Sequence, residues 1–297
     1  MKVARIVTRK PVELTLMWID GVLLFIIATL SFWPVSTNGQ VPDTALKRVL
    51  EIKVGEHAGT AFTVEVDGRQ YVVTAKHLVA KLKPQDTIDV RMDEGWGKLD
   101  VKVYLCDDPV DVAVLIADYL ITATSVQTEL TLEGAKFGQE FYFLGFPYDS
   151  FYSAGGVGNE HHPLPFIKRA TFSGVASDGV FYLDGYNNPG FSGGPIVYRD
   201  LDRSDYTFKV GGVVVAFFPD LLPVLNPVEV KPGEDLKDIE PWRIRKMEDG
   251  KKYKFEDTKQ KVATNTGIVK GYNISTALEL IKKHPDGPKV VQPQPKP

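Results

Sequence analysis

Short runs of alternating or apolar residues, separated by turn residues, recur along this chain from residue 49 to residue 218. Val49–Val54 alternates largely between apolar and polar residues, as a half-buried strand does. Thr60–Val66 and Gln70–Thr74 are joined around Asp67-Gly68, a dipeptide that favours a tight hairpin because both positions tolerate positive φ. Further candidate strands are Val110–Ile116, Glu140–Leu144, Thr171–Ala176, Val180–Leu183, Ile196–Tyr198 and Val210–Phe218. Many short strands of this kind indicate an all-β barrel or sandwich.

The C-terminal part departs from this pattern. Asn273 or Ser275 is expected to cap a helix that carries Ala277, Leu278, Leu280 and Ile281, with lysines in its last turn. Before this helix, residues 226–263 are charged and read as a hairpin that turns at Asp249-Gly250. This segment is too short to form a core of its own, so we interpret it as an insertion in the main domain. Residues 285–297 are rich in proline and lysine and are expected to be a disordered tail.

The bulk composition is that of an ordinary globular protein. Of the 297 residues, 43% are hydrophobic and 25% are charged, which suffices for a sizeable core. The formal net charge of −3 gives no global field that would recruit nucleic acid. Cys106 is the one cysteine of the chain, so an internal disulfide is excluded, and we interpret it as a small, partly buried side chain. The sequence predicts no oligomeric state.

The N-terminus predicts a targeting segment. Lys2, Arg5, Arg9 and Lys10 precede an apolar run over residues 21–33. This run suits the core of a signal peptide and is short for a membrane span. Residues 1–39 are therefore expected to be a signal peptide or a membrane anchor, the anchor using residues 17–35. Either alternative places residues 40–284, the predicted main domain, outside the cytoplasm.

The glycine-rich turn Gly190-Phe-Ser-Gly-Gly-Pro195 presents a serine, and two motifs upstream supply its chemistry. Ser192 becomes a nucleophile only if a base removes its proton. His77, which follows a candidate strand, suits the role of that base. Asp111, which opens another strand, would fix the tautomer of the imidazole. The backbone N–H groups of Gly190 and Ser192 would stabilise the oxyanion. Asp107 and Asp108 compete with Asp111, but both precede Pro109 in a predicted loop.

In this order, the motifs resemble those of chymotrypsin-like serine peptidases, in particular the disulfide-free bacterial branch that includes the HtrA proteases. The matching landmarks are Gly59–Phe62, Thr74–His77, Asp111–Leu115, Gly145–Pro147, Ser173–Ala176, Asn188–Pro195 and the closing strand and helix, Gly267–Ile281. The resemblance covers roughly residues 48 to 283 and implies two six-stranded antiparallel β-barrels with the active site between them and a C-terminal helix. It implies a serine endopeptidase that acts on proteins or peptides through an acyl-enzyme, without a cofactor.

The chain also departs from the family pattern. Phe191 stands where the digestive members carry an aspartate that pairs with a new N-terminus, so their activation switch is not expected here. No peptide-binding PDZ domain is expected after the closing helix. By position, Tyr186 is expected near the floor of the specificity pocket, with Val215, Ala216 and Phe217 along one wall. This lining favours small or medium apolar substrate side chains, although Asp184 argues against that preference. The backbone at 215–217 would pair with an extended substrate as an added strand.

Other interpretations of the same residues remain. The Gly190-x-Ser192-x-Gly194 spacing also fits the nucleophile elbow of α/β-hydrolases, but only His284 follows the serine and the alternating helices are lacking. A peptidase fold with a blocked cleft, acting as a binding module, is the alternative from a different functional class. Glu160-His161-His162 has metal-ligand chemistry, but without a third ligand at a convincing spacing we expect no metal site.

Overall fold

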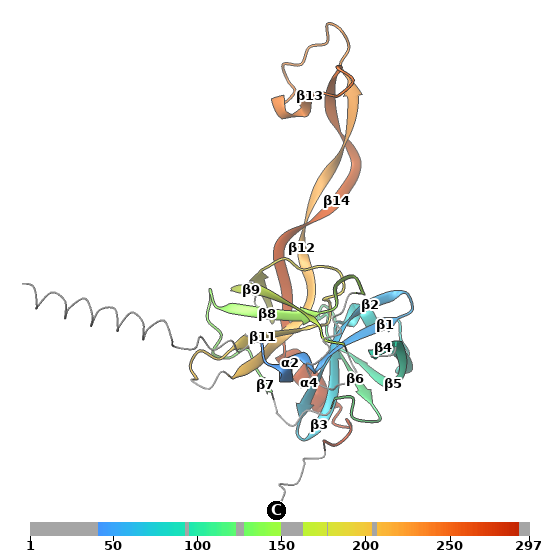
Figure 1. The fold of residues 1–297 in the computed structure, drawn as a ribbon, viewed down its shortest axis with the longest axis vertical. Coiled ribbons are helices and arrows are strands. Elements are labelled where there is room, and N and C mark those ends of the chain that lie inside the picture. Colours follow the sequence, from blue (N-terminus) through green and yellow to red (C-terminus); the bar gives the residue numbers. More distant parts are fainter. Residues whose placement is uncertain are drawn as a thin grey trace, which may run out of the picture. The chain divides into compact units, whose positions relative to one another are not determined.

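The computed structural model of this protein describes residues 41–92, 95–122, 128–149, 163–176, 178–203 and 207–290. Strands dominate these residues, and the helices are short (Figure 1). The helices are α2 (Asp43–Leu46), α3 (Lys76–Val79), η1 (Pro147–Asp149), η2 (Pro241–Arg243) and α4 (Ser275–Lys283). The expected leader or anchor over residues 1–39 lies outside the described residues. Within the described ranges, no helix is long and apolar enough to cross a membrane.

Six strands of the N-terminal half form a closed antiparallel barrel in the order β1-β2-β3-β6-β5-β4. These strands are β1 (Val49–Val54), β2 (His57–Val66), β3 (Arg69–Thr74), β4 (Gln85–Met92), β5 (Gly95–Leu105) and β6 (Ala113–Ala117). The predicted hairpin turn joins β2 to β3, with φ of +49° at Asp67 and +71° at Gly68. Pairing of Ile52 in β1 with Val90 in β4 closes the barrel.

The C-terminal half forms a second sheet. Its strands are β7 (Glu129–Leu130), β8 (Glu140–Gly145), β9 (Phe166–Val175), β10 (Val180–Asp184), β11 (Pro195–Arg199), β12 (Phe208–Glu229), β13 (Ile244–Lys246) and β14 (Lys252–Asn273). The order is β13-β14-β10-β9-β8-β11-β12-β7, and a further pairing of β14 with β12 joins six of these strands into an antiparallel ring. The predicted all-β fold of two six-stranded antiparallel barrels with a C-terminal helix is therefore confirmed.

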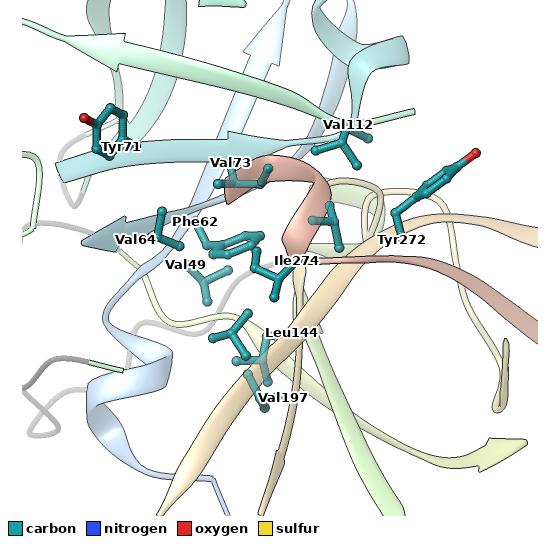
Figure 2. Close-up of a cluster of buried hydrophobic side chains, with 14 of the residues drawn as sticks. Val49, Phe62, Val64, Tyr71, Val73, Val112, Leu144, Val197, Tyr272 and Ile274 are labelled. Atoms are coloured by element: carbon teal, nitrogen blue, oxygen red, sulfur yellow. The ribbon is translucent and has the colours of Figure 1, made fainter. Parts of the chain in front are cut away.

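The core has three parts. Leu50, Ile88 and Leu115 belong to a cluster inside the first barrel, and Phe141 and Phe181 belong to one inside the second. A third cluster joins the two barrels (Figure 2), and its labelled members are Val49, Phe62, Val64, Tyr71, Val73, Val112, Leu144, Val197, Tyr272 and Ile274. Burial of apolar side chains from both barrels in one cluster holds the two barrels together. It thereby fixes the segments that meet between them.

The closing helix α4 begins at Ser275, and its N-cap position is Ile274 rather than the expected Asn273 or Ser275. Asn273 Oδ1 accepts the backbone N–H of Ser275 at 3.0 Å, which satisfies one of the unpaired donors at the start of the helix. Ala277, Leu280 and Ile281 are buried, as the spacing of apolar residues indicates.

The predicted insertion is a long two-stranded ribbon. The expected turn at Asp249-Gly250 joins β13 to β14, with φ of +79° at Gly250. Figure 1 shows β12 and β14 continuing together as one twisted ribbon, with β13 near its far end. The pairing of β12 with β14 extends as far as Glu229 and Tyr253. The entire second half of β12 therefore belongs to the ribbon. Several of its apolar side chains are exposed, including Phe218 and Leu221.

The C-terminal segment differs from the expectation of a tail disordered from residue 285. Gln70 donates its backbone N–H to Pro288 O at 3.0 Å, and Val290 donates to Gly68 O at 2.8 Å. Lys102 and Asp286 form a salt bridge of 2.8 Å. Residues 285–290 therefore lie beside the start of β3, where pairing with β6 has not begun and backbone groups are available. Residues 291–297 lie outside the described residues.

Candidate active site

The pairing of two strands brings a histidine and an aspartate to the same end of the first barrel. β3 pairs with β6 so that Thr74 lies opposite Ala113. His77 follows β3 in the short helix α3, and Asp111 lies two residues before the start of β6. Asp111 Oδ2 lies 2.7 Å from His77 Nδ1, and its Oδ1 accepts the backbone N–H of His77 at 2.8 Å. A carboxylate at Nδ1 makes that nitrogen the protonated one, so Nε2 is left as a proton acceptor.

The competing carboxylate has another partner. Asp108 Oδ1 forms a salt bridge of 2.7 Å with Lys76 Nζ. Lys76 thereby lowers the pKa of the Asp108 carboxyl group, which is 95% exposed. Of the aspartates that the sequence offers, Asp111 is the one that the structure brings to the His77 ring.

The turn that carries Ser192 is held by the first barrel. Thr60 in β2 donates its backbone N–H to Ser192 O at 2.9 Å, and its hydroxyl donates to Gly190 O at 2.6 Å. The second barrel holds the same turn, since Gly193 donates to Val214 O at 2.7 Å. The turn therefore bridges both barrels. Thr60, which makes both contacts from the first barrel, was not singled out from the sequence, although it lies in the Gly59–Phe62 landmark.

Close packing places this turn against the end of β3. Gly193 has φ of +85°, and a Cβ atom there would lie 2.0 Å from Thr60 O and 2.3 Å from Thr74 Oγ1. The same Cβ would lie 2.9 Å from Ala75 N, two residues before His77. Only glycine fits such an approach. The serine motif and the histidine motif, more than a hundred residues apart in the chain, thus meet between the barrels.

Two backbone donors of the turn lack an acceptor in the part of the chain that the structure describes. Gly190 has φ of +102°, and its carbonyl is turned towards Thr60. Within the described part of the chain, neither the N–H of Gly190 nor that of Ser192 donates a hydrogen bond. Unpaired N–H groups beside a serine hydroxyl are the donors that an oxyanion needs.

The Ser192 hydroxyl donates to Val215 O at 3.4 Å. No hydrogen bond joins it to the His77 ring among the described residues. Val215 is the bulged residue of β12, because the register with β14 shifts between Val214 and Ala216. Bulges of this kind re-aim the chain near active sites. In a protein without substrate, catalytic hydrogen bonds are often long or misaligned.

The expected specificity residues divide into two groups. Val215 is buried, whereas Ala216 and Phe217 are half-buried and continue β12 past the bulge. They pair with β14 along one edge, and among the described residues no strand pairs with the other edge of β12 beyond Val213, where the pairing with β11 ends. Tyr186 is 57% exposed, so its ring differs from the expected floor of an enclosed pocket. Asp184 ends β10 and is exposed.

The other reactive groups that the structure describes do not join this site. Burial raises the pKa of the Cys106 thiol, which keeps it protonated at neutral pH. His57 is exposed at the start of β2. Glu160-His161-His162 lies outside the described residues, and within the described ranges no group of three or more metal-ligating side chains gathers.

The fold is chymotrypsin-like. Comparison with solved structures finds similar chains at low sequence identity. An HtrA-type protease, AlgW, with a bound tripeptide is 20% identical, with a TM-score of 0.47 over 80% of this chain, which spans 60% of the AlgW chain. An inactive serine-to-alanine mutant of Rv3671c from M. tuberculosis H37Rv is 19% identical, with a TM-score of 0.46 over 89% of this chain and 96% of that one.

A serine endoprotease from Yersinia pestis is 21% identical, with a TM-score of 0.43 over 62% of this chain and 59% of that one. No protein-family model and no curated protein matches this chain.

Proposed function

We propose that this protein is a serine endopeptidase that cleaves peptide bonds through an acyl-enzyme intermediate. The observation that carries the proposal is the two-point contact of Asp111 with His77, next to a serine turn with two unpaired N–H groups. A histidine with a purely structural role would not require a carboxylate that contacts both its backbone N–H and its ring nitrogen. This arrangement leaves Nε2 ready to accept a proton.

In the proposed reaction the same groups serve first the acylation and then the deacylation of Ser192. Ser192 Oγ bonds to the scissile carbonyl carbon while His77 Nε2 takes the hydroxyl proton. The oxygen of that carbonyl becomes negative and accepts the N–H groups of Gly190 and Ser192, each contributing about 2.7–4 kcal/mol of transition-state stabilisation. The C–N bond then breaks, and His77 gives its proton to the leaving amine. A water molecule, deprotonated by His77, attacks the acyl carbon. The ester C–O bond to Ser192 Oγ then breaks, His77 returns the proton to that oxygen, and the product leaves as a carboxylic acid.

Substrate would bind along the open edge of β12. Val215, Ala216 and Phe217 lie beyond the last pairing with β11, so an extended peptide can add there as a strand. The apolar character of this wall supports a preference for small or medium apolar side chains, with Tyr186 contacting the substrate at an exposed rim. The basic and apolar N-terminal segment supports a location outside the cytoplasm, because residues 17–35 would anchor the chain in a membrane or direct its export. The protein or peptide substrates would then be met there.

The hydroxyl contact with Val215 O favours one competing function. A serine held away from its base would make the same fold a peptide-binding module with a blocked reaction. Such a module would bind extended peptides along β12 and leave them intact.

Cleavage of an unfolded protein tests these two functions. The full chain is incubated with casein, and the products are mapped by mass spectrometry. We expect fragments from the parent and none from Ser192→Ala. Ser173→Ala is the matched control, because Ser173 is an exposed serine of β9 whose hydroxyl donates to Thr171 O. Peptide binding without cleavage by the parent would instead establish the binding module.

A further inference from the structure

The amine of Lys168 contacts the segment that leads to the serine turn. Lys168 projects from β9, and its Nζ donates to Tyr186 O at 2.6 Å and to Asn188 Oδ1. The same nitrogen lies 5.4 Å from the centre of the Tyr186 ring and 5.5 Å from that of Phe191. One ammonium group thus contacts three residues of the 186–191 segment.

Among the described residues, no carboxylate pairs with this ammonium group. Within the described ranges Lys168 forms no salt bridge, and burial lowers the pKa of its half-buried amine. Withdrawing a cation from water is unfavourable unless other groups solvate it. Here a carbonyl oxygen, an amide oxygen and two aromatic faces do so. All of these groups belong to the 186–191 segment, so the cation and the segment hold each other in place.

The segment needs such support because it has no ladder of strand hydrogen bonds. Residues 185–194 form bends and turns between β10 and β11. The far side of the segment is held by Thr60 at Gly190 O and by Asn265, whose amide donates to Asn187 O. Lys168 supplies the contacts at Tyr186 and Asn188. The unpaired N–H groups of Gly190 and Ser192 come directly after these contacts.

We propose that Lys168 is a positioning residue whose ammonium group holds residues 186–191 so that the N–H groups of Gly190 and Ser192 face the substrate carbonyl. The inference rests on the proposed function, since it assigns Lys168 a role in the same site. Lys168 itself touches neither the substrate nor the reacting atoms. Removal of the ammonium group therefore slows the chemical step and leaves the initial binding of substrate largely unchanged.

The variants separate the charge from the rest of the side chain. Lys168→Met keeps most of the apolar stem and removes the donors, whereas Lys168→Arg keeps charge and donors. Asn188→Ala removes one acceptor of the same contact. Arg169→Met is the matched control, because Arg169 is the next residue of β9 and pairs with Glu140 in an exposed salt bridge of 3.2 Å.

The experiment measures how fast a fluorophosphonate labels Ser192 in the full chain, over a range of probe concentrations. We expect the limiting rate constant of Lys168→Met to fall by about 10- to 100-fold, as for a small misplacement of catalytic groups. The probe concentration at half the limiting rate should stay within about twofold, because ground-state binding is not lost. Lys168→Arg should recover part of the rate, and Arg169→Met should match the parent. Thermal unfolding accompanies each measurement.

The outcomes separate this inference from the proposed function. A parent that is labelled and a folded Lys168→Met variant that is labelled equally fast would overturn the role of Lys168 alone. A folded parent that is not labelled at Ser192 would overturn both. A merely structural role would lower the unfolding temperature and the labelled fraction without changing the rate of the folded fraction, which also contradicts the inference. If Lys168→Met does not fold, Asn188→Ala decides, since a parent-like rate there overturns the proposal.

Discussion

Asp111 contacts His77 at two points, with Oδ2 2.7 Å from Nδ1 and Oδ1 2.8 Å from the backbone nitrogen. An asparagine at this position keeps the shape, but its amide stabilises the wrong tautomer of the imidazole. We expect Asp111→Asn to lower the turnover of peptide substrate by about 10⁴-fold, the loss typical of such a change in a triad. Asp108→Asn is the matched control, because Asp108 pairs with Lys76 instead. Equal activity of the two variants would contradict the assignment of Asp111.

The glycine after the serine is expected to be irreplaceable. Gly193 and Gly250 have similar φ values of +85° and +79°, but only at Gly193 would a Cβ meet backbone, at 2.0 Å from Thr60 O. Gly250→Ala should lower the free energy of unfolding by about 1–2 kcal/mol through its backbone conformation alone. Gly193→Ala should cost at least about 2 kcal/mol more through overpacking. Urea unfolding measures both, and equal losses would show that the turn is not packed as described.

A buried ion pair in the second barrel predicts a pH dependence of stability. Lys209 Nζ lies 3.0 Å from Asp200 Oδ2, and both residues are buried. Lys209 lowers the pKa of Asp200, and Asp200 in turn raises the pKa of Lys209. The contribution of Asp200 to the free energy of unfolding is therefore fully present above its unfolded pKa of about 3.9. This contribution is lost as the pH falls through the lower pKa of the folded state. The contribution of Lys209 to the free energy of unfolding is fully present below its unfolded pKa of about 10.4 and is lost as the pH rises through the raised pKa of the folded state.

Replacing the lysine tests this linkage. Lys209→Met should destabilise the protein at neutral pH, because it leaves the Asp200 carboxylate buried without its cation. The difference from the parent should shrink in acid, where Asp200 is protonated. Lys136→Met is the control, since the Lys136–Asp202 pair is exposed and worth little. A difference that stays constant from neutral pH down to acid would rule out the ionic origin.

The ribbon of β12 and β14 is expected to be dispensable for the fold. No buried core residue lies between residues 216 and 268. Asp220 pairs with Thr264, so residues 221–263 can be replaced by a two-residue Asn-Gly turn that retains this pair. We expect the shortened chain to keep its unfolding temperature and its phosphonate labelling. Labelling that is lost while the fold persists would show that the ribbon is part of the active site.

Much of the fold was predictable because local signals agreed with it. Asp67-Gly68 placed a turn, and alternation placed the strands on either side of it. We did not predict β4 and β5, whose apolar residues are interrupted by charged ones. The length of β12 was also missed, since Pro219, Pro223 and Pro227 argue against a strand. A two-stranded ribbon tolerates them because each strand has an edge that needs no donor.

The site was predictable only in part, because its residues meet through long-range packing. The order of the histidine, aspartate and serine motifs indicated the chemistry. The contact between Asp111 and His77 depends on the register of β3 with β6, and no local pattern specifies that register. Lys168 and Thr60 act through contacts with residues 18 to 130 positions away, so the sequence carried no local signal for the role of Lys168.

Fluorophosphonate labelling of the full chain tests the central claim most directly, with the modified residue located by peptide mapping. The account predicts one adduct on Ser192 of the parent and of His57→Ala, whose histidine is exposed at the start of β2. It predicts no adduct at this position in Ser192→Ala and a rate lower by orders of magnitude in His77→Ala. A folded parent that stays unmodified, or one labelled equally fast without His77, would contradict the claim that His77 activates Ser192.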